Sequence, residues 1–168
     1  MKIPNIKQKT IYELSLLFDN KRITKLICLI TCVVGSLTAF SCSGARIIWR
    51  ICVLPKYVLP LMLFNILWIL NCFMFGIVIA IAFSCRGSKS IFLRSLISYF
   101  TALFWYPLLL GSTAAFCAAA SIFISAAYLI SVSRVFFRYS LIGAAASGMI
   151  ILFFIYVLYF TLSFATLN

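Results

Sequence analysis

The stretch from Tyr57 to Ser84, with the sequence YVLPLMLFNILWILNCFMFGIVIAIAFS, decides the fold class of this chain. It runs for 28 residues without a charged side chain. A helix needs about 20 apolar residues to cross a hydrocarbon core of roughly 30 Å. The stretch therefore predicts a membrane-spanning helix preceded by a short interfacial segment that contains Pro60.

The rest of the 168-residue chain has the same apolar character. Hydrophobic residues make up 65% of it and the mean hydropathy is +1.20, whereas a soluble domain of this length needs far more charged surface. No acidic residue follows Asp19, and the chain contains no histidine. Side chains that act as general bases, proton relays or metal ligands are therefore missing from the membrane part. A site there has to be built from aromatic, amide, hydroxyl, thiol and backbone groups.

Charged and helix-breaking residues divide the apolar sequence into five spans. The longest run, about Leu96 to Ser133, exceeds one span and holds Pro107 and the turn sequence Gly111-Ser112-Thr113. The predicted helices cover residues 26–43, 57–84, 91–110, 113–133 and 141–167. The predicted fold class is all-α, a polytopic membrane protein with a five-transmembrane-helix bundle at residues 23–168, preceded by a leader at residues 1–22.

The basic residues predict the topology. In a soluble protein the net charge of +12 would suggest a nucleic-acid partner, but here the 14 basic residues lie in the leader and between the apolar runs. Five spans put eleven of them on one side of the membrane and three on the other. The positive-inside rule then predicts a cytoplasmic amino terminus and an external carboxyl terminus. The expected location is a bacterial inner membrane, and no nucleic-acid partner is expected.

The leader and the small residues allow more than one interpretation. Ile11, Leu14, Leu17 and Phe18 share a helical face, which predicts either an interfacial amphipathic helix or a disordered tail, and no signal-peptide cleavage pattern is present. Alanine and serine cluster in the fourth span and at the start of the fifth. Such stretches let membrane helices approach closely, either inside one chain or across a dimer.

Tryptophans and amides are the most specific side chains in the apolar part. Trp68 and Trp105 lie within spans, and Trp49 lies in the first connection between helices. Indole rings stack on flat ligands and donate one hydrogen bond each. Trp49 is also typical of the aromatic belt at a membrane interface, and core packing is the alternative to a ligand pocket for Trp68 and Trp105. Asn65 and Asn71 need hydrogen-bond partners in lipid, from another helix or from a ligand.

Three stretches resemble a known family. Pro55, Pro60, Phe64, Trp68 and Gly76 are in register with the signature of the TspO/MBR family (translocator protein, or tryptophan-rich sensory protein), and Tyr57 replaces a Trp of that signature. Leu103-Phe-Trp105-Tyr-Pro107-Leu-Leu-Leu-Gly111 is similar to the helix-three motif, and Phe164-Ala-Thr-Leu-Asn168 to the closing motif. Together the similarities span roughly residues 30–168.

The resemblance implies a function. Family members bind porphyrins and, in mitochondrial forms, cholesterol. The ligand occupies a pocket of the five-helix bundle that the first connecting loop caps. The resemblance also implies a homodimer. The resemblance implies a non-enzymatic role in transport or stress sensing, with no cofactor beyond a porphyrin, sterol or lipid ligand. Basic residues at the rim, including Arg50 and Lys56, would meet the porphyrin propionates. The expected ligand-binding residues are Arg46, Trp49, Tyr57, Phe64, Trp68, Asn71 and Trp105.

The chain also departs from the family pattern. Leu59, Met62, Asn65, Ile66 and Ala102 replace motif residues, and Thr161 stands where helix five carries a Trp. The missing Trp argues against the light-driven porphyrin breakdown reported for some bacterial members. The sterol-binding pattern sought near the carboxyl terminus is absent because no basic residue follows Arg138.

Two other functions remain open. The seven cysteines include Cys28 and Cys32, which are four residues apart and share a helical face, as in a thiol-based membrane redox enzyme. Small apolar packing also explains cysteines at such positions. A structural or assembly subunit without a small ligand is the other alternative.

Overall fold

A computed structural model describes residues 21–41, 52–84, 89–110 and 114–168 of the chain. Within these ranges the chain forms five α-helices and no β-strand. The helices are α2 (Lys21–Ser41), α4 (Leu61–Ser84), α5 (Lys89–Leu110), α6 (Ala115–Tyr139) and α7 (Leu141–Leu167). The predicted all-α, five-helix fold is confirmed. The leader helix predicted around Ile11 to Phe18 lies outside the described residues.

All five helices are long and apolar enough to cross a membrane. Their candidate spans range from 19 residues in α2 to 27 residues in α7. Large apolar side chains face outward along them, including Phe40, Phe116 and Phe123. Because such surface is favourable in lipid and unfavourable in water, the chain is an integral, multi-pass membrane protein in contact with membrane lipid.

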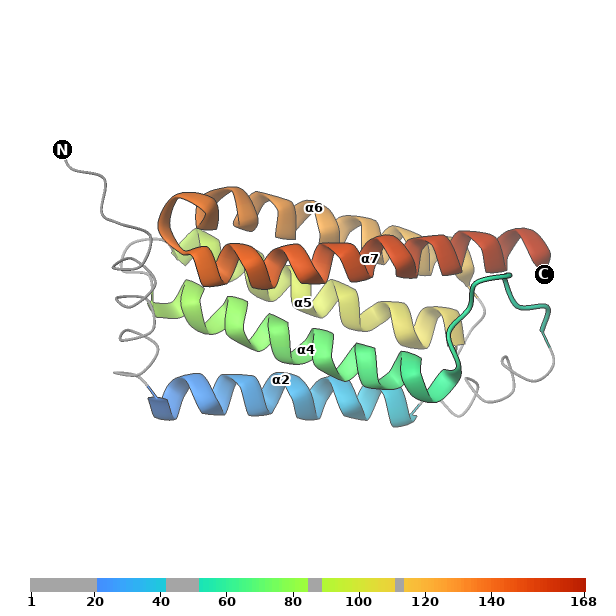
Figure 1. The fold of residues 1–168 in the computed structure, drawn as a ribbon, viewed down its shortest axis with the longest axis horizontal. Coiled ribbons are helices and arrows are strands. Elements are labelled where there is room, and N and C mark those ends of the chain that lie inside the picture. Colours follow the sequence, from blue (N-terminus) through green and yellow to red (C-terminus); the bar gives the residue numbers. More distant parts are fainter. Residues whose placement is uncertain (1–20, 42–51, 85–88, 111–113) are drawn as a thin grey trace.

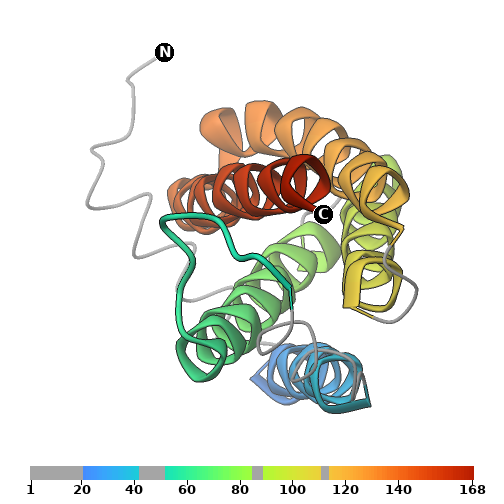
Figure 2. The same cartoon turned by 90° about the vertical axis from the view of Figure 1, so that its right-hand side faces the viewer.

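The helices run antiparallel in chain order and α4 lies at the centre of their contacts (Figure 1). Viewed along the bundle, α4 packs against α2, α5 and α7, while α6 covers α5 and α7 on the opposite side (Figure 2). The outermost helix is α2, which packs on α4 and meets α5 only slightly. One hydrophobic core includes residues from all five helices.

The α2–α4 contact depends on two glycines. A Cβ atom added to Gly35 of α2 would lie 2.2 Å from Cys72 Sγ and 2.8 Å from Cys72 Cβ on α4. On Gly76 of α4 it would lie 2.8 Å from the Cα of Cys28 on α2. These two sites let the helix backbones approach closely, as small residues do in membrane proteins.

Small residues also close the interface between α5 and α6. The Ser98 hydroxyl donates to the Ser125 carbonyl at 2.8 Å, and the Ser125 hydroxyl donates to the Ser98 carbonyl at 2.6 Å. Ala118 and Ser125, from the predicted small-residue stretch, are fully buried. Packing inside one chain, one of the two predicted uses of this stretch, therefore accounts for these residues.

The fourth helix is longer than the sequence pattern predicts. The predicted end at residue 133 is wrong, because α6 continues to Tyr139 and includes Arg134 and Arg138. Arg138 in the last turn complements the negative end of the helix dipole. The break comes at Ser140, whose backbone is extended and whose hydroxyl accepts a hydrogen bond from the Gly143 amide at 2.9 Å. This cap starts α7 with only Ser140 between the two helices.

The second helix begins after Pro60, as the sequence predicts, and the interfacial position of the segment before it stays a prediction. The helix begins at Leu61, and the Phe64 amide donates to the Pro60 carbonyl at 2.9 Å. Residues 52–60 before it are not helical. They lie across the end of the bundle where α7 ends (Figure 1).

Candidate functional site

Residues 52–60, called the end segment below, are tied to α7. The Val53 amide donates to Asn168 Oδ1 at 3.2 Å, and Asn168 Nδ2 donates to the Val53 carbonyl at 3.0 Å. The Leu59 amide donates to the Tyr156 hydroxyl at 3.0 Å. The end segment is therefore held over the helices by residues that follow it by about a hundred positions.

A cluster of aromatic rings fills the bundle next to the end segment. The ring centroids of Trp68 and Trp105 are 5.5 Å apart, as are those of Phe64 and Trp105. Tyr106 packs edge-on against Trp68 at 5.2 Å, and Phe160 lies 6.3 Å from Trp105. This aromatic cluster consists of Phe64, Trp68, Trp105, Tyr106, Phe153, Tyr156 and Phe160. Three helices contribute to it: α4, α5 and α7.

Hydrogen bonds fix the rings in place. The Trp105 indole N–H donates to Thr161 Oγ1 at 2.7 Å, and the Trp68 indole N–H donates to the Gly35 carbonyl at 3.2 Å. The Tyr106 hydroxyl donates to Asn65 Oδ1 at 2.5 Å. Among the described residues, no buried side-chain nitrogen or oxygen lacks a hydrogen-bond partner. The polar edges of these rings are therefore satisfied inside the protein, and their faces are left for packing.

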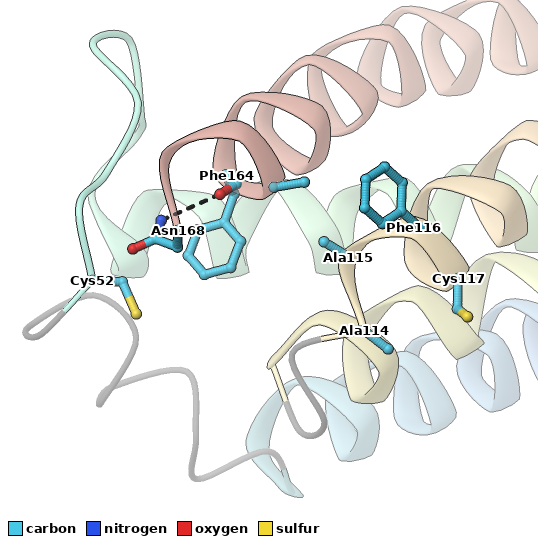
Figure 3. Close-up of a pocket in the computed structure, with 8 residues that line it drawn as sticks. Cys52, Ala114, Ala115, Phe116, Cys117, Phe164 and Asn168 are labelled. Atoms are coloured by element: carbon cyan, nitrogen blue, oxygen red, sulfur yellow. Dashed lines mark hydrogen bonds between the residues drawn. The ribbon is translucent and has the colours of Figure 1, made fainter.

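A pocket of about 480 Å³ opens at the same end of the bundle (Figure 3). This end pocket is lined by Cys52 of the end segment, by the first turn of α6 from Ala114 to Cys117, and by Phe164, Ala165 and Asn168 of α7. Its volume is in the range of small-molecule sites, about 300–1,000 Å³. The Phe164 ring lies 6.2 Å from Phe160, which contacts Trp105 and Phe64. Phe164 thus lies between the pocket and the aromatic cluster, whose own rings are buried behind it.

The structure brings some of the predicted ligand-binding residues together and separates others. Phe64, Trp68 and Trp105 are in mutual contact within the cluster, and only 1% of Trp68 and none of Trp105 is exposed. Asn71 is buried one turn further along α4. Tyr57 is 68% exposed in the end segment, away from the ring cluster. Arg46 and Trp49, like Arg50, lie outside the described residues.

Sequence reasoning missed part of the site. Tyr106 was not among the expected site residues, and Thr161 was noted only as a departure from the family pattern. Along α7, Phe153, Tyr156, Phe160 and Phe164 follow one another at spacings of three or four residues. This spacing puts aromatic rings on one helical face and could have identified the α7 side of the cluster.

No disulfide joins the cysteines of the described residues to one another. Cys28, Cys32, Cys52, Cys72 and Cys117 are free thiols. Cys28 and Cys32 are half-buried on α2, and the Cys28 side chain lies close to Gly76 of α4. Within the described ranges, no group of three or more His, Cys, Asp or Glu residues could hold a metal ion. The redox role predicted for Cys28 and Cys32 stays a prediction.

No family model matches the sequence, and no curated protein matches it.

Proposed function

We propose that this protein binds a flat hydrophobic ligand at the end pocket and the adjoining aromatic cluster, and acts in transport or stress sensing. A porphyrin is the first candidate ligand, with a sterol or another lipid as the alternative. The observation that carries the proposal is the continuity from the pocket wall at Phe164, through Phe160, to the Trp105 and Phe64 rings. A flat apolar ligand in the pocket gains stacking contact from the Phe164 ring, which the cluster supports from behind.

The three stretches that resemble the TspO/MBR family meet at this end, which supports the same proposal. Phe64 and Trp68 from the first stretch contact Trp105 from the second. Asn168 from the third stretch hydrogen-bonds to Val53, two residues before Pro55. Segments that resemble the binding motifs of one family are therefore neighbours in space although they are far apart in the sequence.

Two departures from the family pattern have a structural role at the cluster. Thr161, at the position of the family's helix-five Trp, accepts the hydrogen bond of the Trp105 indole. Asn65, which replaces a glycine of the signature, accepts the hydrogen bond of the Tyr106 hydroxyl. The two replacements accept hydrogen bonds from rings of the cluster and do not contribute a further aromatic ring. The proposed role is accordingly binding without light-driven turnover.

Ligand entry would take place beside the end segment. Three hydrogen bonds tie this segment to α7, two at Val53 and one at Leu59, on either side of the buried Pro55. Hydrogen bonds of this kind contribute about 0.5–1.5 kcal/mol each, so the segment can separate locally from α7 without unfolding the bundle. Exposed Lys56 lies in the same segment, where it would meet a ligand carboxylate.

Protoporphyrin IX titration of the detergent-purified protein tests the proposal. The change in porphyrin absorbance is followed together with the quenching of tryptophan fluorescence. We expect saturable binding that Phe164→Ala weakens about fivefold, because an aromatic contact contributes about 0.5–1.5 kcal/mol beyond the buried area. Trp105→Phe removes one quenched indole at the cluster and should reduce the quenching amplitude.

Phe123→Ala is the matched control, because Phe123 is an exposed aromatic residue of α6 outside the end pocket. It should bind porphyrin like the unchanged protein. Absence of saturable binding in a monodisperse sample would contradict the porphyrin proposal, and a sterol titration by the same quenching would then decide the alternative ligand.

The topology belongs to the same proposal. We infer a cytoplasmic amino terminus and an external carboxyl terminus, which puts the end pocket on the external side of a bacterial inner membrane. Support comes from the described basic residues: Lys21, Arg22, Lys25, Lys89, Arg94, Arg134 and Arg138 lie toward one end of the bundle, and Lys56 lies at the other. A homodimer is the proposed assembly. Labelling of single engineered cysteines from each side of the membrane tests the orientation.

A further inference from the structure

A second cavity, of about 370 Å³, lies between α2 and α5 at the end of the bundle opposite the end pocket. Its walls include Ile23, Ile27 and Val34 of α2 and Phe92, Leu96 and Phe100 of α5, and α4 forms its floor. We call it the α2–α5 groove. None of its lining residues belongs to the aromatic cluster or to the end pocket.

The groove exists because its two walls pack on different partners. Helix α2 packs on α4, whereas α5 packs mainly on α6, so α2 and α5 meet only slightly. A hydrogen bond from the Tyr99 hydroxyl to the Thr31 carbonyl, at 2.7 Å, joins the two helices. The Thr31 hydroxyl donates to the Cys28 carbonyl within α2 at 3.0 Å. With these groups satisfied, the groove presents a hydrocarbon surface.

The length of the groove fits one leaflet of a membrane. Ile23 and Val34, its outermost residues on α2, are eleven positions apart. At 1.5 Å per residue this corresponds to about 16 Å along the helix. That is about half of a hydrocarbon core of roughly 30 Å. An acyl chain of the leaflet at this end of the bundle has the matching depth.

The mouth of the groove is basic. Helices α2 and α5 both begin there, with Arg22 and Lys25 in the first turns of α2 and Lys89 and Arg94 in the first turns of α5. All four side chains are exposed, and no acidic residue occurs in the described parts of the chain. Lys89 precedes Phe92 by three residues and therefore shares its helical face, whereas Arg94 is on another face.

We propose that the α2–α5 groove binds a membrane phospholipid with an anionic headgroup. One acyl chain lies between α2 and α5, and the headgroup phosphate meets Lys89 at the mouth. The hydrocarbon lining excludes a polar ligand, and the basic mouth favours an anionic headgroup over a zwitterionic one. A second copy of this chain fits less well, because a symmetric contact across this face would bring the same basic residues together.

Native mass spectrometry of the full-length protein, released from micelles that contain either phosphatidylglycerol or phosphatidylcholine with identical acyl chains, tests the proposal. We expect preferential retention of phosphatidylglycerol. Lys89→Gln should lower this retention about fivefold, since a basic residue near a membrane surface contributes about 1 kcal/mol to anionic-lipid binding. Arg94→Gln removes the same charge from another face of the same helix and should leave the retention unchanged.

A groove-filling variant separates this site from lipid that merely surrounds the protein. Ile27→Trp occupies the cavity and should abolish the retained phosphatidylglycerol. Equal retention of the two lipids, or a Lys89→Gln protein that retains as much as the unchanged one, would overturn the proposal. A dimer that dissociates on Ile27→Trp would also overturn it and assign the groove to a second copy. If Ile27→Trp fails to fold, the comparison of Lys89→Gln with Arg94→Gln still decides whether the groove binds an anionic lipid. The outcome of this comparison does not depend on whether the protein binds porphyrin.

Discussion

The aromatic cluster and the α2–α5 groove both involve α4 and α5, and both consist of apolar side chains. Aromatic rings fill the space in the cluster, whereas the space in the groove stays open. In the cluster, rings from three helices contact one another, and the Trp105 and Trp68 indoles are anchored by hydrogen bonds. Beside the groove, close backbone contact at Gly35 and Gly76 fixes α2 on α4 and leaves α2 apart from α5. Apolar composition alone therefore does not determine whether the space between two helices is filled. Here it depends on rings held by hydrogen bonds and on glycines that set how closely two helices approach.

Trp105→Ala should give the largest loss of stability, because it empties the centre of the cluster. Replacing a buried aromatic residue by alanine costs about 3–5 kcal/mol. The free energy of unfolding, measured by denaturant titration in mixed micelles, should fall by that amount. Phe104→Ala is the matched control, since the adjacent Phe104 is 61% exposed. A similar loss for both variants would mean that the rings do not form the packed centre.

Gly35→Ala should destabilise the contact between α2 and α4. The added methyl group would lie 2.8 Å from Cys72 Cβ, so the helices have to separate, and overpacking of this kind costs about 1–3 kcal/mol. Gly148→Ala of α7 is the control, because an added Cβ there meets no atom within 4 Å. It should stabilise the protein by up to about 1 kcal/mol. The same denaturant titration measures both, and equal effects would contradict the close contact.

Thr161→Val should cost about 1–2 kcal/mol, because it leaves the buried Trp105 indole N–H without its acceptor. The same change in a Trp105→Phe background should cost less, since no indole donor remains to be satisfied. A double-mutant cycle of unfolding free energies measures this coupling. Additive effects of the two substitutions would show that the hydrogen bond does not stabilise the cluster.

Asn168→Ala should have the smallest effect and act mainly on the end segment, since its side chain otherwise donates to the Phe164 carbonyl at the end of α7. It removes both hydrogen bonds to Val53, which are exposed and therefore worth about 1 kcal/mol together. The rate of maleimide labelling at Cys52 should rise up to about fivefold. Cys117, already exposed on α6, is the internal reference and should label at an unchanged rate. An unchanged rate at Cys52 would mean that Asn168 does not hold the segment.

The fold was more predictable than the site. The apolar run from Tyr57 to Ser84 predicted a helix that the structure starts at Leu61 and ends at Ser84, with Pro60 before it as expected. The end of the fourth helix was misplaced because Arg134 and Arg138 were taken as a loop signal, although arginine is also a good helix former. The break at Ser140 depends on its extended backbone and its cap on Gly143, which a charge pattern does not report.

At the site, Trp68 and Trp105 were expected to bind a ligand, which stays a prediction. The structure shows that their rings contact each other, and neither this contact nor their hydrogen-bond partners were predicted. The acceptors are the Gly35 carbonyl, 33 positions from Trp68, and Thr161, 56 positions from Trp105. The α2–α5 groove was not predicted either. Its lining residues have the same hydropathy as those of any other span, so nothing local distinguishes them.

The sequence by itself determined that this chain is a five-span membrane protein and which segments form the spans, because the cost of placing a residue in lipid is a property of that residue and its near neighbours. Only the tertiary structure decided which rings pack together, which glycines lie at close contacts, and where the bundle stays open. These features depend on pairs of residues from different helices, and uniformly apolar helices carry no local signal for which faces will meet.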